Sequence, residues 1–102
     1  MAPLAESLRV LIAEDSAADR LLLSSIVRRQ GHEVLVAANG VEAVELYRQQ
    51  RPHLVLMDAM MPVMDGFDAA RQIKQLAGET LVPIIFLTVS YTHLTLPTSD
   101  LV

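Results

Sequence analysis

The side chains best suited to chemistry in this sequence are three acids and a threonine, each placed just after or at the end of a short apolar run. They are Glu14, Asp15, Asp58 and Thr88. Carboxylates packed together repel one another unless a cation joins them, and an all-oxygen ligand set suits Mg²⁺. A carboxylate can also act as a nucleophile and form an aspartyl-phosphate. If the runs are neighbouring strands, the pattern predicts a magnesium site where Asp58 accepts a phosphoryl group and Thr88 holds its oxygens.

The apolar runs that would position these side chains have the length and β-branched content of buried strands. Between them lie segments with helical periodicity, expected to begin after Ser16, after the capping box of Asn39 and Glu42, and at Gly66. In the first of these segments, the apolar residues from Leu22 to Val27 fall on one helical face. The expected strands are residues 9–13, 33–37, 54–57 and 83–88.

Strands and helices therefore alternate as β-α-β-α-β-α-β, which predicts an α/β fold with a parallel sheet and helices on both faces. In open sheets of this kind, ligand sites form outside the carboxyl ends of the strands. The three acids and the threonine lie at those ends, so the fold class and the predicted site support each other.

Bulk properties exclude several other classes of protein. The chain has 102 residues, 52% of them hydrophobic, and a formal charge of −4. This composition fits one small domain and disfavours direct nucleic-acid binding. The absence of cysteine excludes disulfides and thiolate metal sites, and it suits a cytoplasmic location. No apolar run is long enough to span a membrane. Residues 1–8 are expected to form a flexible lead-in.

Three segments carry a resemblance to a known family. They are Glu14-Asp15-Ser16, Asp58-Ala-Met-Met-Pro-Val-Met-Asp-Gly66 and Pro83-Ile-Ile-Phe-Leu-Thr88. The set resembles the receiver domain of the response regulators of bacterial two-component systems. The resemblance implies a flavodoxin-like doubly wound sheet with strand order 2-1-3-4 in the part present.

The resemblance also assigns roles to the site residues. It implies that Asp58 is the phosphoacceptor, that Glu14, Asp15, Asp58 and the backbone carbonyl of Met60 bind Mg²⁺, and that Thr88 is the switch hydroxyl. A sensor histidine kinase or phosphotransfer protein would donate the phosphoryl group, and an output domain or effector would read the result. The chain would then be a signalling switch in phosphorelay signal transduction and not an enzyme with an external substrate.

The resemblance stops after Thr88. The fifth strand of such domains, with its lysine, and the last two helices have no counterpart, and Lys74 lies in the third expected helix. Residues 89–98 resemble a translated sequencing adapter, so we expect a truncated receiver over residues 9–88 and a foreign or irregular tail over residues 89–102. A natural short variant is the alternative. Without a fifth strand the fourth becomes an open edge, so partial unfolding or aggregation of this chain is expected.

Two other functions stay open at this stage. A Mg²⁺-dependent phosphohydrolase could pass through an aspartyl-phosphate, although such enzymes usually carry Asp-x-Asp and Met60 stands where the second acid would be. A receiver-like interaction module that works without phosphorylation is the second alternative, against which the complete acidic trio argues.

Other residues admit simpler interpretations. Asp65 precedes Gly66 and a helix, so an N-cap is favoured over a metal ligand. The methionines at positions 57, 60, 61 and 64 are interpreted as core and loop packing and not as a soft-metal site. His32 and His53 are expected at the surface, and Arg20, Arg28 and Arg29 on a solvated helix face.

Overall fold

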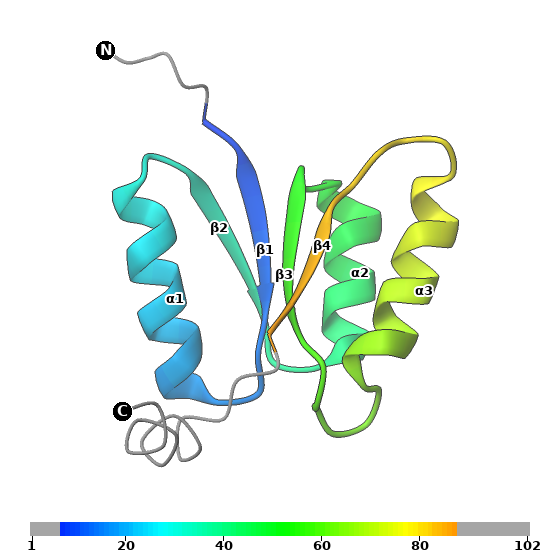
Figure 1. The fold of residues 1–102 in the computed structure, drawn as a ribbon, viewed down its shortest axis with the longest axis horizontal. Helices are drawn as coiled ribbons and strands as arrows, with labels where there is room; N and C mark the ends of the chain where they lie inside the picture. The colour runs from blue at the N-terminus through cyan, green and yellow to red at the C-terminus, as the bar shows by residue number, and fades with distance from the viewer. Residues whose placement is uncertain (1–6, 88–102) are drawn as a thin grey trace, which may run out of the picture.

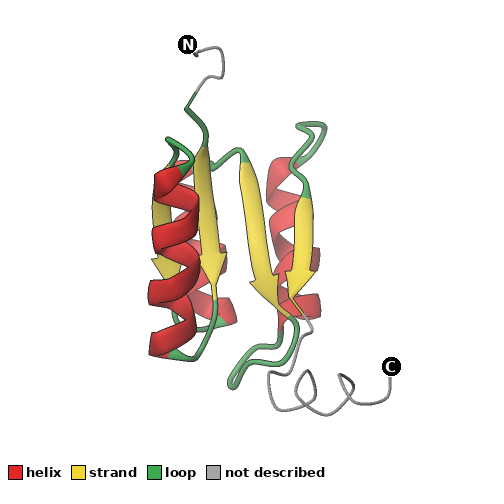
Figure 2. Ribbon diagram, turned by 60° about the vertical axis from the view of Figure 1, so that its left-hand side comes forward, coloured by secondary structure: helices red, strands yellow, loops and turns green. Residues whose placement is uncertain are grey.

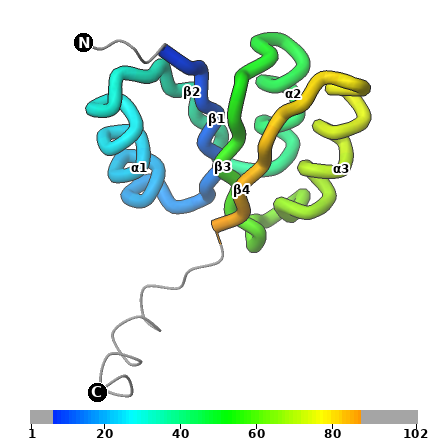
Figure 3. Tube along the Cα trace, turned by 45° about the horizontal axis from the view of Figure 1, so that its top comes forward, coloured from blue at the N-terminus to red at the C-terminus, as the bar shows by residue number. Residues whose placement is uncertain are grey.

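Four parallel strands form one sheet in the computed structural model, which describes residues 7–87. The strands are β1 (Arg9–Ala13), β2 (Glu33–Ala37), β3 (Leu54–Asp58) and β4 (Ile84–Leu87). The helices are α1 (Ala17–Arg29), α2 (Gly40–Gln50) and α3 (Gly66–Ala77). The strands lie side by side in the order β2-β1-β3-β4 (Figure 3), so the predicted fold class and strand order are confirmed.

The helices divide between the two faces of the sheet. The α1 helix lies on one face, and α2 and α3 lie together on the other (Figure 1). All four strands point the same way, so their arrowheads meet at one edge of the sheet (Figure 2). We call this the carboxyl edge and the opposite one the amino edge. The side chains at and just after the ends of β1, β2 and β3 are thereby brought to the carboxyl edge.

Side-chain caps explain why two of the helices begin where the sequence predicts. The Ser16 hydroxyl accepts the backbone N–H of Asp19 at 3.3 Å at the start of α1. At the start of α2, the Asn39 side chain accepts the N–H of Glu42 at 2.9 Å, and the Glu42 carboxylate accepts the N–H of Ala38 at 2.8 Å. These bonds satisfy backbone donors that the first helical turn leaves free.

The face covered by α2 and α3 contains the core. Leu11 and Val55 pair across β1 and β3 and are fully buried, together with Met57. Tyr47 of α2 and Ile73 of α3 pack onto them with at most 1% of their surface exposed. Burial of such side chains stabilises the fold by about 1.5–3 kcal/mol each.

The face covered by α1 is only partly closed within residues 7–87. The most buried residue of α1 is Ser24, while Leu22 and Ile26 of the predicted apolar stripe are 51% and 47% exposed. Within residues 7–87, α1 packs mainly against β1 and β2, and Ile85 of the outer strand β4 is 50% exposed on this face. Ser24 is the residue that faces the sheet where α1 packs on it. The prediction that Leu22 and Ile26 lie on the buried face of α1 is therefore wrong.

Several predictions concern the ends of the chain. The described part of the last strand is Ile84–Leu87, within the predicted 83–88. Thr88, the tail and residues 1–6 of the predicted lead-in lie outside the described residues. Leu8, the last residue of the predicted lead-in, donates its N–H to His32 Nδ1 at 3.0 Å and accepts the N–H of Glu33 at 2.8 Å through its carbonyl. None of the helices in residues 7–87 is long and apolar enough to cross a bilayer.

Candidate metal-binding site

The three predicted acids come together at the carboxyl edge. Glu14 and Asp15 directly follow β1, and Asp58 is the last residue of β3. These strands pair in parallel with Ala13 opposite Met57, so the acids after them become neighbours. One carboxylate oxygen from each of the three lies within 4.8 Å of the others. A single small cation could therefore contact all three.

Glu14 is the most buried of the acids, with 8% of its surface exposed. Burial raises the pKa of its carboxyl to about 7, the N–H of Ser16 opposes this, and the charge of Asp58 adds to the rise. Loss of hydration and a like charge both disfavour the ionised form. A metal ion in contact with both carboxylates would favour their ionised forms and so oppose the rise in pKa.

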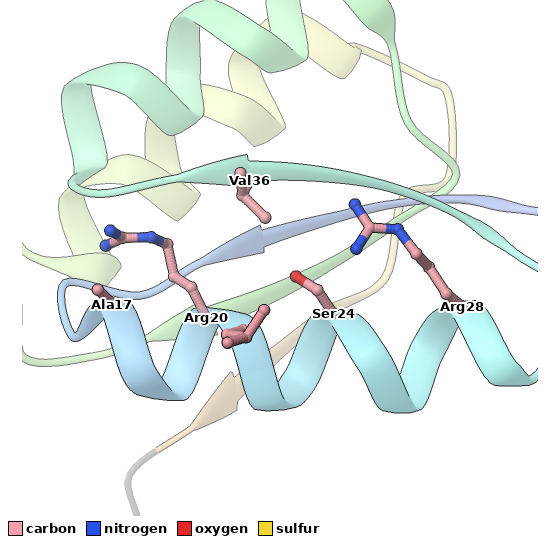
Figure 4. A pocket seen from close by; sticks show the side chains of 6 residues that line it. Ala17, Arg20, Ser24, Arg28 and Val36 are labelled. Atoms are coloured by element: carbon pink, nitrogen blue, oxygen red, sulfur yellow. The ribbon is translucent and has the colours of Figure 1, made fainter.

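The turn that carries Glu14 and Asp15 is held by hydrogen bonds to its own backbone and side chain. The N–H of Ser16 donates to Glu14 Oε2 at 3.2 Å, and Arg20 Nη1 donates to the Glu14 carbonyl oxygen at 2.7 Å. Figure 4 shows Arg20 extending from α1 as one of the side chains that line a pocket between α1 and Val36. Sequence reasoning treated Arg20 as a solvated side chain, and only the folded turn brings this carbonyl within its reach.

The loop after β3 fixes the other side of the site. The N–H of Met60 donates to Asp58 Oδ1 at 3.0 Å, and the N–H of Gly66 donates to the Ala59 carbonyl at 3.0 Å. A Cβ on Gly66 would lie 2.3 Å from the Asp58 carbonyl oxygen, so no side chain fits there. Asp65 caps α3 by accepting the N–H of Asp68 at 2.9 Å, which confirms the N-cap interpretation.

No basic side chain of residues 7–87 pairs with the acidic trio. The three ion pairs in this part of the chain involve other acids: Arg9 with Glu33, Arg48 with Glu45 and Arg71 with Asp68. Lys74 donates to the Val82 carbonyl at 2.6 Å, just before β4 begins, so it lies toward the amino edge. A set of close, unpaired carboxylate oxygens fits a hard divalent cation such as Mg²⁺.

The methionines and histidines of the sequence analysis have the following places in the structure. Met57 and Met61 are buried in the core and Met64 packs against it, as the packing interpretation expects, whereas Met60 is 77% exposed. His32 and His53 each accept a backbone N–H through Nδ1, from Leu8 at 3.0 Å and Arg9 at 2.9 Å, at the amino edge. Thr88, the fourth side chain of the predicted site, lies outside the described residues.

Comparison with protein families gives one match that covers most of the chain. A family model described as the response regulator receiver domain matches residues 10–97, a range that ends within the part of the tail that the structure does not describe.

Curated relatives agree with this match. The protein PilH of Pseudomonas aeruginosa is 41% identical over 80 residues, which are 78% of this chain and 66% of PilH. The transcriptional regulatory protein PdtaR of Mycobacterium tuberculosis is 47% identical over 81 residues, which are 78% of this chain and 38% of PdtaR. The chain thus spans less than two thirds of the length of these relatives.

Solved structures share the fold. The receiver domain of the sensor histidine kinase PA1611 from Pseudomonas aeruginosa, with a magnesium ion in its active-site cleft, superimposes with a TM-score of 0.76 at 34% identity, over 81% of this chain and 68% of that one. The receiver domain of Saccharomyces cerevisiae Ssk1, solved with the phosphotransfer protein Ypd1, gives a TM-score of 0.75 at 31% identity, over 86% of this chain and 68% of that one.

Proposed function

Because the chain belongs to the response regulator receiver domain family, we propose that it accepts a phosphoryl group on Asp58 in the presence of Mg²⁺ and acts as a signalling switch. The observation that carries the proposal is the convergence of three carboxylates within 4.8 Å at the carboxyl edge. Glu14, Asp15, Asp58 and the backbone carbonyl of Met60 would bind the metal. Thr88 would contribute its hydroxyl to the phosphoryl oxygens.

The proposal gives the residues of the site separate roles in the transfer. An Asp58 carboxylate oxygen attacks phosphorus and forms a new O–P bond, while the bond from phosphorus to the donor atom breaks and its electrons leave with the donor. A metal held by these residues would supply positive charge that offsets the repulsion between the phosphoryl oxygens and the carboxylates. The Met60 N–H orients Asp58 by its hydrogen bond to Oδ1. The burial of Glu14 keeps part of the site away from water.

Partners and boundaries belong to the same proposal. The donor would be a sensor histidine kinase or a phosphotransfer protein, as Ypd1 is seen with the Ssk1 receiver domain. An output domain or separate effector would read the phosphorylated form. The partial receiver domain would comprise residues 9–88, residues 89–102 would be a foreign or irregular tail, and the chain would be cytoplasmic; these stay predictions.

Phosphorylation with a small-molecule donor tests the proposal directly. The chain is incubated with acetyl phosphate and Mg²⁺, and intact-mass spectrometry follows the addition of one phosphoryl group. We expect addition in the wild type, none in Asp58→Asn, and none after chelation of the metal. Addition that persists in Asp58→Asn would show that another residue is the acceptor. Beryllofluoride mimics the phosphoryl group. With Mg²⁺ it should shift the amide resonances of residues around Asp58 in the wild type and not in Asp58→Asn.

The phosphohydrolase alternative lacks support from the described residues. Its second acid would stand two positions after Asp58, where the exposed thioether of Met60 cannot transfer a proton. Release of phosphate from a generic phosphomonoester, abolished by Asp58→Asn, would favour that alternative over a switch.

A further inference from the structure

Gly40, the first residue of α2, touches the loop between β3 and α3. A Cβ built on Gly40 would lie 2.4 Å from the carbonyl oxygen of Met64 and 2.9 Å from its Cβ. The nearest atom is backbone, so a side chain at position 40 could be accommodated only by moving the loop. The missing side chain of Gly40 therefore lets two connections, one after β2 and one after β3, pack directly against each other.

The same loop contains a strained turn. The N–H of Met64 donates to the Pro62 carbonyl at 2.8 Å across Val63, whose φ is 71°. This three-residue turn with a positive φ is rare for a β-branched residue, and strain of this kind costs about 1–3 kcal/mol. Val63 is 85% exposed, so the packing of its own side chain does not hold the turn. Contacts of the neighbouring residues must hold it.

Two contacts limit where the loop can go. At its base, Gly66 donates to the Ala59 carbonyl at 3.0 Å and lies against the Asp58 backbone. Farther along, Met64 lies against Gly40 and its side chain packs on the core. Met60, which the proposed function makes a metal ligand, lies between these two points.

We infer that Gly40 is a positioning residue for the proposed magnesium site. By letting the Met64 backbone lie against the start of α2, it fixes the path of the loop, and so the placement of the Met60 carbonyl and of the Met60 N–H that binds Asp58. The inference rests on the proposed function, because the loop is argued to supply a ligand to the metal.

The first test is Gly40→Ala in the full chain, with Mg²⁺ affinity measured by calorimetry. We expect the affinity to fall by about tenfold, the loss typical when a group that orients a metal ligand is removed. The matched control is Ile73→Val, which lowers stability by about 0.5–1.5 kcal/mol through the core and should leave Mg²⁺ affinity unchanged. In metal-free samples, the amide resonances of residues 60–64 should move in Gly40→Ala and stay in place in Ile73→Val.

A second variant separates positioning from a general loss of structure. In Gly40→Ala/Val63→Gly, the glycine adopts a wide range of φ at low cost, so the displaced loop can return Met60 to the site. We expect part of the lost Mg²⁺ affinity to be recovered. The inference would be overturned if the double variant bound Mg²⁺ no better than Gly40→Ala. Wild-type Mg²⁺ affinity in Gly40→Ala would also overturn it.

Two further outcomes are also decisive. If the wild type itself shows no Mg²⁺ binding, the proposed function fails, and positioning of the loop by Gly40 is then judged on the metal-free resonances alone: unchanged resonances overturn it, and shifted ones support it. If neither Gly40→Ala nor the double variant folds, Gly40 serves the fold as a whole and the inference is wrong.

Discussion

The carboxyl edge and the amino edge of the sheet are built from the ends of the same strands, yet the polar side chains at the two edges have different partners. At the amino edge, His32 and His53 accept the N–H groups where β1 begins, and Arg9 pairs with Glu33. At the carboxyl edge, Glu14 and the two aspartates have no basic partner within residues 7–87. Satisfied polar groups stabilise a fold, and close unpaired charges destabilise it unless a ligand supplies the opposite charge. The comparison therefore favours the carboxyl edge for the metal binding that we propose.

The largest expected effect is the loss of a charge from the carboxyl edge. Asp15→Asn should weaken Mg²⁺ binding by at least about tenfold, because removal of a ligand should cost no less than removal of an outer partner, which costs about 10–100-fold. Calorimetric titration measures the change. Asp68→Asn, which removes the same charge from an exposed ion pair on α3, is the control. Equal affinity in the two variants would contradict the proposed metal site.

The second effect concerns Gly66, which lies against the backbone of Asp58. Gly66→Ala should lower the free energy of unfolding by about 2–3 kcal/mol, because its Cβ would overlap the Asp58 carbonyl and force the backbone to move. Gly78→Ala is the comparison. An alanine is strained at the φ of 62° that Gly78 adopts, but its Cβ would meet nothing within 4 Å, so the expected cost is about 1 kcal/mol. Urea unfolding of both variants measures the difference. Equal costs would mean that the close approach at Gly66 is not rigid.

A third effect is a pH dependence that arises from Glu14. Since burial raises its pKa to about 7, the folded metal-free chain keeps a proton that the unfolded chain releases near its ordinary pKa of about 4.3. The stability that Glu14 contributes is therefore greatest below that ordinary value and is lost as pH rises toward 7. Mg²⁺ competes with the same proton for Glu14. As the pH is lowered from 7, the affinity for Mg²⁺ should therefore decrease by up to about tenfold per pH unit.

Glu14→Gln separates this effect from other titrations. The variant should lose most of the fall in melting temperature between about pH 5 and pH 7 seen in the metal-free wild type. An unchanged pH profile in Glu14→Gln would assign the titration to another group. Thermal melts with and without Mg²⁺ across this range provide the measurement.

The smallest effect is expected at the amino edge. His53→Ala removes the acceptor for the N–H of Arg9 and should cost about 0.5–1.5 kcal/mol, as for an ordinary hydrogen bond. Mg²⁺ affinity should not change. A change in metal affinity with His53→Ala would break the distinction between the two edges, because it would couple the amino edge to the site.

Local sequence signals were sufficient to predict the helices, the strands and the acidic trio. Helix starts depend on caps such as Ser16 and Asn39 that act within a few residues, and parallel strands bring their ends together by topology alone. The burial of Ser24 and the contact of Arg20 with the Glu14 carbonyl depend on how closely α1 approaches the sheet. The close packing of Gly40 likewise depends on a loop distant in the sequence, for which no local pattern exists.

The exposure of Met60 has a consequence for the oxidative chemistry of the protein. Met60 is 77% exposed beside Asp58, while Met57 and Met61 are buried. Mild peroxide should therefore convert Met60 to the sulfoxide before those two, since susceptibility follows exposure. The backbone carbonyl proposed as a ligand is chemically unchanged by that reaction. Oxidation at this position would thus add a polar group beside the proposed site without changing the carbonyl oxygen.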